Sequence, residues 1–138
     1  MTAILLDTNV LSELVRAKPN ARVIAFMDST PDLLISAMSV QEIAFGVERA
    51  PDPARRAKLG AWLANVRRQF HGRVVEIDWA VAESAARIRA NAAAQGASHD
   101  TIDALIAACA LARGVPIATR NVRDFAAFGV DLINPWAA

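Results

Sequence analysis

Hydrophobic residues in this chain occur in two patterns: short continuous runs, and longer stretches in which they recur every three or four positions. Five short runs predict buried strands, because a strand covered on both faces is apolar along its length. These runs are 3–6, 33–37, 73–77, 116–119 and 130–133. Between these runs the apolar residues recur with helical spacing, so strands and helices alternate along the chain. This alternation predicts a single α/β domain over residues 1–138, with a roughly five-stranded, mainly parallel sheet flanked by helices.

Capping and helix-breaking residues indicate where the helices begin and end. Four side chains able to accept a hydrogen bond from a free backbone N–H group are expected to begin helices. They are Asn20, Ser39, Asp78 and Asp100. Pro53 suits the first turn of another helix, and Gly96 and Gly114 are expected to end two more.

Composition narrows the class of protein. Hydrophobic residues make up 54% of the chain and charged residues 21%, which is typical of a globular protein. The apolar stretch 104–112 is too short to cross a bilayer, so no membrane association is expected. The single cysteine, Cys109, excludes an intrachain disulfide. No export leader is recognisable, and the cytoplasm is the expected compartment.

Charge is distributed unevenly, although the net charge is only +1. The segment 49–73 carries seven basic residues and one acid, Asp52. Such a segment would suit phosphates, but the simpler interpretation is the solvated face of a helix. The chain has no tyrosine and few other aromatic residues, which argues against a base-stacking platform for single strands.

Acidic residues follow the expected strands. Asp7, Glu42 and Asp124 come after the first, second and fourth strands, and Asp103 lies in the first turn of the last long helix. Because sites in parallel sheets form beyond the carboxyl ends of the strands, these acids are expected to converge. Four carboxylates would repel one another. A divalent cation that prefers oxygen ligands, Mg²⁺ or Mn²⁺, would relieve that repulsion.

Each acid also has a purely structural interpretation. The spacing of Ser39 and Glu42 is that of a capping box, in which Glu42 would satisfy the start of a helix. Asp103 would be favourable near a helix N-terminus for electrostatic reasons. Asp78 also follows a strand, yet it is expected to be a plain N-cap. Position at a strand end is therefore a weak indication of a site by itself.

The local sequences around these acids strengthen the case. They are Leu6–Asn9, Ser39–Ile43, Ile102–Ala108 and Ala118–Phe125, followed by Asn134–Trp136. In this order and spacing they resemble the PIN domain, and especially the VapC and FitB ribonuclease toxins of bacterial type II toxin–antitoxin pairs. The resemblance runs from about residue 4 to residue 136.

This resemblance implies Mg²⁺- or Mn²⁺-dependent cleavage of RNA, homodimerisation and inhibition by a cognate antitoxin protein, with which larger assemblies would form. By position, Asp7, Glu42 and Asp103 match the three core acids of the family. Asp7 and Asp103 are the expected direct metal ligands, and Glu42 would bind through water or assist deprotonation. The fourth position is open: it would be filled by Asp124, by Asn121, or by both through water.

Polar and basic residues flank the acids. Asn9 and Thr119 match residues that orient the acidic groups in the family. Arg120 and Arg123 would either hold RNA phosphates or neutralise the acidic edge, and the sequence does not separate these roles.

The aromatic residues favour a homodimer independently of the resemblance. Four large aromatic side chains exceed what a small core readily hides, which places some apolar surface in a two-fold interface. They are Trp62, Phe70, Trp79 and Trp136.

Two other functions are compatible with the same acids. A DNA nuclease or phosphatase would use an identical metal site, and a non-catalytic PIN-like module would bind nucleic acid or a partner without cutting. A nucleotide-binding domain is disfavoured, because no glycine-rich loop follows the first strand. His71 and His99 are poor general-base candidates, because both are expected in loops.

Overall fold

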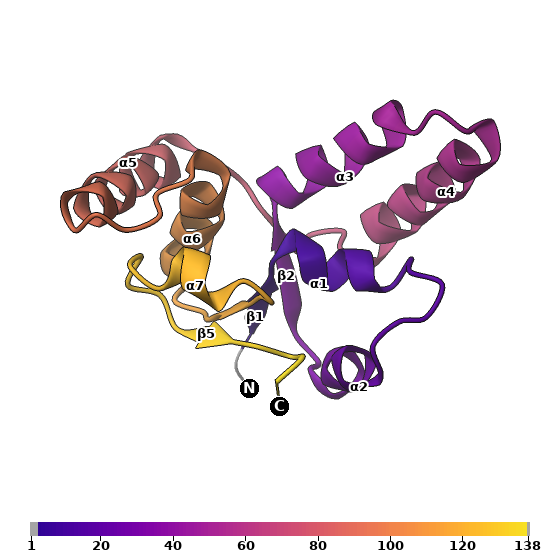
Figure 1. Ribbon diagram of the computed structural model, residues 1–138, viewed down its shortest axis with the longest axis horizontal. Coiled ribbons are helices and arrows are strands. Elements are labelled where there is room, and N and C mark those ends of the chain that lie inside the picture. Colours follow the sequence, from indigo (N-terminus) through magenta and orange to yellow (C-terminus); the bar gives the residue numbers. More distant parts are fainter. Residues whose placement is uncertain (1–2, 138) are drawn as a thin grey trace.

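A parallel sheet between two groups of helices forms the framework of the protein, as a computed structural model that describes residues 3–137 shows (Figure 1). The strands are β1 (Ile4–Leu6), β2 (Leu33–Ser36), β3 (Val74–Val75), β4 (Ile117–Ala118) and β5 (Leu132–Ile133). They lie in the order β3-β2-β1-β4-β5, and every neighbouring pair is parallel. The expected α/β fold with a five-stranded parallel sheet is confirmed.

Seven helices connect and flank the strands in residues 3–137. They are α1 (Thr8–Glu13), α2 (Ala21–Ser29), α3 (Ala37–Arg49), α4 (Pro53–Gln69), α5 (Trp79–Ala94), α6 (Thr101–Arg113) and α7 (Val122–Phe125). Three expected N-caps are confirmed, because the side chains of Asn20, Asp78 and Asp100 each accept a backbone N–H bond at a helix start. Gly114 ends α6 in the left-handed conformation, with φ of 64°.

Several expected boundaries were wrong. Helix α3 begins at Ala37 and not at Ser39, because the side chain of Ser36 accepts a hydrogen bond from the Ser39 backbone N–H at 3.2 Å and caps the helix. The expected strands 73–77, 116–119 and 130–133 are each only two residues long. Helix α7 was missed, because four residues are too few to display a helical period.

The two faces of the sheet bury alternate residues of the same strands. One face packs against α5, α6 and α7, and the other against α1, α2, α3 and α4. Because side chains alternate in direction along a strand, neighbours separate into the two cores. Leu5, Leu34 and Ile117 lie in the first core, and Leu6, Ile35 and Ala118 in the second.

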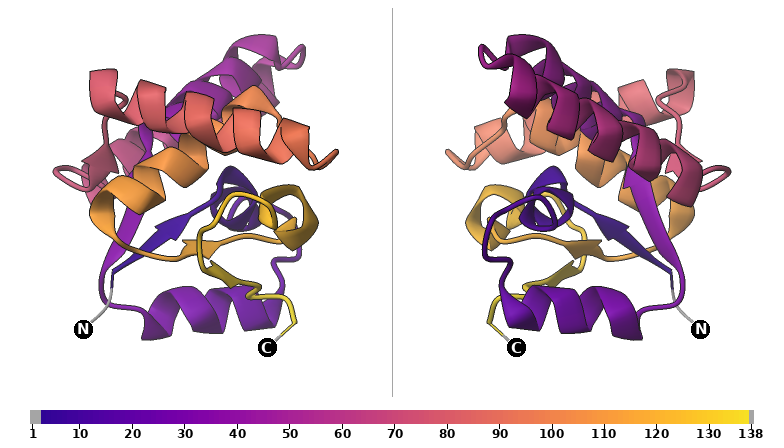
Figure 2. Two further views of the ribbon diagram at one scale, coloured as in Figure 1. Left: turned by 90° about the vertical axis from the view of Figure 1, so that its left-hand side faces the viewer. Right: turned by 90° about the vertical axis from the view of Figure 1, so that its right-hand side faces the viewer.

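The chain changes direction across the sheet at β1, which positions the site. From β1 the chain proceeds to β2 and β3 on one side, and later to β4 and β5 on the other. The carboxyl ends of β1 and β4 therefore flank the crevice where α/β proteins usually bind ligands. Helix α2 lies at the opposite end of the molecule from α3 and α4 (Figure 2). None of the helices in residues 3–137 is long and apolar enough to cross a membrane.

Asp78→Ala is expected to lower the free energy of unfolding by about 1 kcal/mol and to leave unchanged the RNA cleavage that the sequence predicts. The Asp78 side chain accepts a hydrogen bond from the Val81 backbone N–H at 2.9 Å, so the substitution removes the N-cap of α5. Urea denaturation would measure the loss. A fully folded but inactive Asp78→Ala protein would contradict this capping role and would assign Asp78 to the functional site.

Candidate active site

Asp7 lies at the centre of the crevice between β1 and β4. It directly follows β1, caps α1 and is 6% exposed. One carboxylate oxygen, Oδ1, accepts a hydrogen bond from the Thr8 backbone N–H at 2.8 Å. The other, Oδ2, accepts hydrogen bonds from Thr119 Oγ1 at 2.8 Å and from Asn9 Nδ2 at 3.2 Å. The backbone and two neighbours from separate strand ends therefore fix the orientation of this carboxylate.

Glu42 faces the same crevice from α3. Because α3 begins at Ala37, Glu42 lies beyond the first turn, and the capping-box interpretation of this residue was wrong. Its carboxylate instead accepts a hydrogen bond from the hydroxyl of Thr8, which also lies 2.9 Å from the hydroxyl of Ser39. Thr8 thus connects the second acid to the backbone that holds the first.

Asp103 is brought to the site by the N-terminus of α6. Its backbone N–H donates to Asp100 Oδ2 at 3.0 Å. Within residues 3–137 its own carboxylate accepts no hydrogen bond and pairs with no cation. Burial, followed by the charges of Asp100, Asp7, Asp124 and Glu42, raises the pKa of Asp103 to about 7.

Asp124 and Asn121 occupy different positions around the cluster. Asp124 is half-buried on α7, the short helix that the sequence pattern did not predict. Its charge raises the pKa values of Asp7 and Asp103, yet its side chain does not line the crevice itself. Asn121 does line it, and the Asn121 backbone N–H donates to Thr119 Oγ1 at 3.0 Å.

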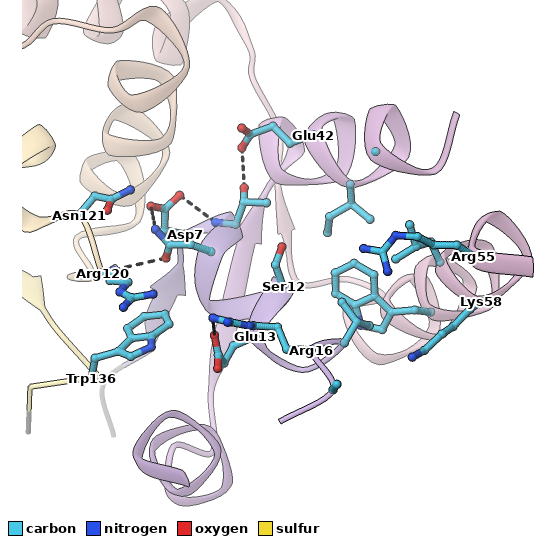
Figure 3. Close-up of a pocket in the computed structure, with 18 of the residues that line it drawn as sticks. Asp7, Ser12, Glu13, Arg16, Glu42, Arg55, Lys58, Arg120, Asn121 and Trp136 are labelled. Carbon is cyan, nitrogen blue, oxygen red and sulfur yellow. Dashed lines mark hydrogen bonds and ion pairs between the residues drawn. The ribbon is translucent and has the colours of Figure 1, made fainter. Parts of the chain in front are cut away.

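The crevice opens into a cleft of about 820 Å³ between the sheet edge, α1, α3 and α4 (Figure 3). Asp7, Glu42 and Asp103 all line it. Ile43, Leu59 and Trp62 supply apolar lining, and Arg16, Arg55 and Lys58 add positive charge. The cleft therefore presents an acidic cluster, an apolar surface and a group of cations to one ligand.

The electrostatics of the acids are those of crowded carboxylates. Burial is the largest cause of the raised pKa of Asp7, and hydrogen bonds from Thr119 and Thr8 partly offset it. Burial also raises the pKa of Glu42; the Thr8 hydrogen bond lowers it, and the charges of Asp7 and Asp100 raise it further. The charge of Asp7 therefore makes ionisation of Glu42 and Asp103 less favourable, and a bound cation would reverse that effect.

The donor set fits a hard divalent ion by its chemistry. All the candidate ligands are oxygens, which Mg²⁺ and Mn²⁺ prefer. No three His, Cys, Asp or Glu side chains in residues 3–137 are already placed to hold one ion together. The fit thus rests on ligand type and mutual charge, not on a preassembled set of ligands.

Three contributors to the site escaped sequence reasoning. Thr8 orients Glu42, Asp100 adds its charge to the cluster, and Trp136 lines the cleft. The position of Thr8 between Asp7 and Asn9 was the available signal. Asp100 was recognised only as the cap of α6.

Most of the basic segment 49–73 has a structural role or faces solvent. Of its basic residues only Arg55 and Lys58 line the cleft, whereas Arg73 pairs with Asp32. Arg120 lines the cleft and Arg123 does not. His71 and His99 are both exposed and do not line the cleft, in agreement with the expectation that they are poor general-base candidates.

The metal-free protein is expected to lose stability as the pH rises through about 7. The pKa of Asp103 is raised from its ordinary value of 3.8, so the folded protein binds this proton more tightly than the unfolded chain. The resulting stabilisation is fully present below the ordinary pKa and is lost as pH passes the raised one. Urea denaturation with a chelator present would measure this slope. Asp103→Asn should flatten it, and an unchanged slope in that variant would contradict the assignment.

Comparison with known proteins finds one matching family model and several similar proteins. The PIN domain family model matches residues 4–130. The VapC ribonuclease Y4jK of Sinorhizobium fredii is 39% identical over 136 residues, which cover 96% of this chain and 97% of the relative. Toxin FitB of Neisseria gonorrhoeae is 38% identical, with 96% and 98% covered. The crystal structure of FitAcB from the same organism superposes with a TM-score of 0.93 at 37% identity, over 98% of this chain and 99% of that one.

Proposed function

Because this chain belongs to the PIN domain family, we propose that it is a Mg²⁺- or Mn²⁺-dependent endoribonuclease and the toxin of a type II toxin–antitoxin pair. One observation carries the proposal: Asp7, Glu42 and Asp103 come from three separate segments and line one cleft. The charge of Asp7 raises the pKa of Glu42, and the charges of Asp7 and Glu42 both raise the pKa of Asp103. The names of relatives such as VapC ribonuclease Y4jK and toxin FitB support the substrate class and the biological role. Such an enzyme would act on cytoplasmic RNA.

The residues divide the work of phosphodiester hydrolysis. Asp7 and Asp103 would hold the metal ion, Asp7 in an orientation set by its three hydrogen bonds. The ion supplies, when bound, charge stabilisation at the phosphoryl group and a more acidic water. Glu42, oriented by Thr8, would accept a proton from the attacking water. Asn121 and Asp124 would complete the outer shell of polar groups.

Cleavage of RNA by purified protein tests the proposal directly. We expect products with Mg²⁺ or Mn²⁺ and none after chelation with EDTA, with activity restored by either metal. RNA, single-stranded DNA, flap DNA and a phosphomonoester should be compared in parallel. Cleavage of DNA alone would favour the DNA nuclease, and phosphate release alone the phosphatase. Tight RNA binding without cleavage would favour the non-catalytic module.

An antitoxin segment is the proposed inhibitor, and the cleft supplies complementary chemistry. The apolar lining made by Ile43, Leu59 and Trp62 would receive the apolar face of an amphipathic helix. A basic side chain from the same segment would reach the carboxylates of Asp7 and Asp103. Binding there would block both the RNA path and the metal site.

A homodimer is expected at micromolar concentration. Trp79 is 82% exposed at the start of α5, and Leu111 on α6 is also exposed, so apolar surface remains uncovered in one copy. Phe70 no longer supports the argument because it is buried in the core, and Trp62 and Trp136 line the cleft. Light scattering that reports only monomer would refute the dimer.

A further inference from the structure

Arg120 is a cation beside the acidic cluster that pairs with none of the acids. Within residues 3–137 the ion pairs are Arg16 with Glu13 and Arg73 with Asp32. Arg120 makes one hydrogen bond there, from its backbone N–H to Asn9 Oδ1 at 3.4 Å, so its guanidinium donors are unused. Neutralisation of the acidic edge, one of the two roles expected from the sequence, would require a carboxylate partner that these contacts do not supply.

The Arg120 guanidinium instead lies against an aromatic ring. Its carbon Cζ is 5.3 Å from the centroid of the Trp136 ring, and both side chains line the cleft beside Asp7 (Figure 3). An arginine stacked on an aromatic face keeps its planar, two-pronged edge available for a bidentate acceptor. The ring thus holds the cation without consuming its hydrogen-bond donors.

Trp136 is itself anchored on both sides. The Trp136 backbone N–H donates to Asn134 Oδ1 at 2.9 Å, and its carbonyl accepts a hydrogen bond from Arg22 Nη1 at 3.3 Å. The preceding residue, Pro135, is fully buried. The turn after β5 therefore holds the indole ring in the cleft, where Arg120 meets it.

We propose that Arg120 binds a backbone phosphate of the RNA substrate next to the cleaved bond, and that Trp136 is the positioning residue for its guanidinium. The inference rests on the proposed ribonuclease function. A phosphodiester must approach the carboxylates to be cut, and an unneutralised cation in the same cleft offsets their repulsion. A partner protein has no such requirement, so the position of Arg120 favours RNA. Arg123 is outside the cleft lining and receives no such role.

Steady-state cleavage of a short labelled RNA tests both residues. Arg120→Ala should lower kcat/KM by about tenfold to a hundredfold, the loss expected for a charge-assisted hydrogen bond, and Arg120→Lys should fall between it and wild type. Trp136→Leu should lower kcat/KM by about threefold through loss of the cation–π contact, and Trp136→Phe should restore most of it.

Arg49→Ala is the matched control. The Arg49 guanidinium also lies over an aromatic ring, 5.6 Å from the centroid of Phe45, but it is outside the cleft lining. Arg49→Ala removes the same charge and the same type of contact as Arg120→Ala, but outside the cleft. The kcat/KM of Arg49→Ala should therefore equal that of wild type.

Salt dependence separates a phosphate contact from a structural role. RNA affinity should be measured by fluorescence anisotropy over a series of KCl concentrations. Every protein in this series also carries Asp103→Asn, which prevents cleavage of the RNA. Arg120→Ala should reduce the slope of log affinity against log salt by about 0.7, the value for one phosphate contact with a single strand. Trp136→Leu should reduce it partly, and Arg49→Ala should leave it unchanged. Melting temperatures identify any variant that is not folded.

Each contrary outcome has a distinct meaning. Wild-type kcat/KM and salt slope in Arg120→Ala would overturn the phosphate contact, and wild-type values in Trp136→Leu would overturn the positioning role. If Arg120→Ala weakened binding of the antitoxin but not of RNA, the residue would belong to a protein interface and the inference would be wrong. If wild-type protein neither bound nor cleaved RNA, the proposed function itself would fail.

Discussion

Asp103→Asn is expected to reduce metal-dependent RNA cleavage at least a hundredfold, because loss of even an outer-shell group costs about tenfold to a hundredfold. The protein should stay folded, since the Asp103 carboxylate accepts no hydrogen bond within residues 3–137. Its stability at neutral pH should hold or rise, because the substitution removes a charge that burial and four neighbouring acids disfavour. Initial rates at saturating Mg²⁺, together with urea denaturation, measure both effects.

Asp7→Asn should lose activity to the same extent but behave differently in stability. Both oxygens of Asp7 accept hydrogen bonds, and an amide has only one acceptor atom. The substitution should therefore cost about 1–3 kcal/mol, the usual penalty for a buried donor or acceptor left unsatisfied. Asp28→Asn, an exposed acid on α2, is the control and should match wild type in both assays. Full activity in Asp7→Asn or Asp103→Asn would remove that residue from the set of proposed metal ligands.

Antitoxin binding is expected to weaken by about tenfold to a hundredfold in Asp103→Asn, as a charge-assisted pair would be lost. The metal-free cluster of Asp7, Glu42 and Asp103 is an anionic site that an arginine or lysine of the antitoxin would occupy in place of the metal ion. Saturating Mg²⁺ or Mn²⁺ should therefore weaken the same complex. Calorimetry with the proposed cognate antitoxin measures the affinity.

Ionic strength must be matched in this experiment, because added salt screens exposed charges without occupying the site. Sodium chloride at the ionic strength of the Mg²⁺ buffer is the control, and Asp28→Asn should bind the antitoxin like wild type. An affinity that neither the metal nor Asp103→Asn alters would exclude charge substitution. It would leave simple coverage of the RNA path as the means of inhibition.

The role of Glu42 shows how local sequence and tertiary structure compete. From the sequence alone, Ser39 and Glu42 fit a capping box as well as they fit a catalytic site. In the structure Ser36 caps α3, and Glu42 instead accepts a hydrogen bond from Thr8, 34 residues earlier in the chain. No periodicity reports such a contact, because it depends on how α3 packs beside α1.

The sequence by itself determined which segments are strands, where acids follow them and which family motifs surround those acids. These features are local, because alternation of apolar runs and the residue after a strand depend only on neighbours in the chain. It also determined the caps at Asn20, Asp78 and Asp100, where one side chain serves its own helix start.

Tertiary structure alone decided which candidates share a surface. It brought Asn121 and Arg120 into the cleft and left Arg123 outside, although the three are close neighbours in sequence. It also placed Trp136 from the chain's last turn against Arg120. The physical reason is that the order of strands and the packing of helices set distances between residues far apart in the chain, and no local pattern encodes them.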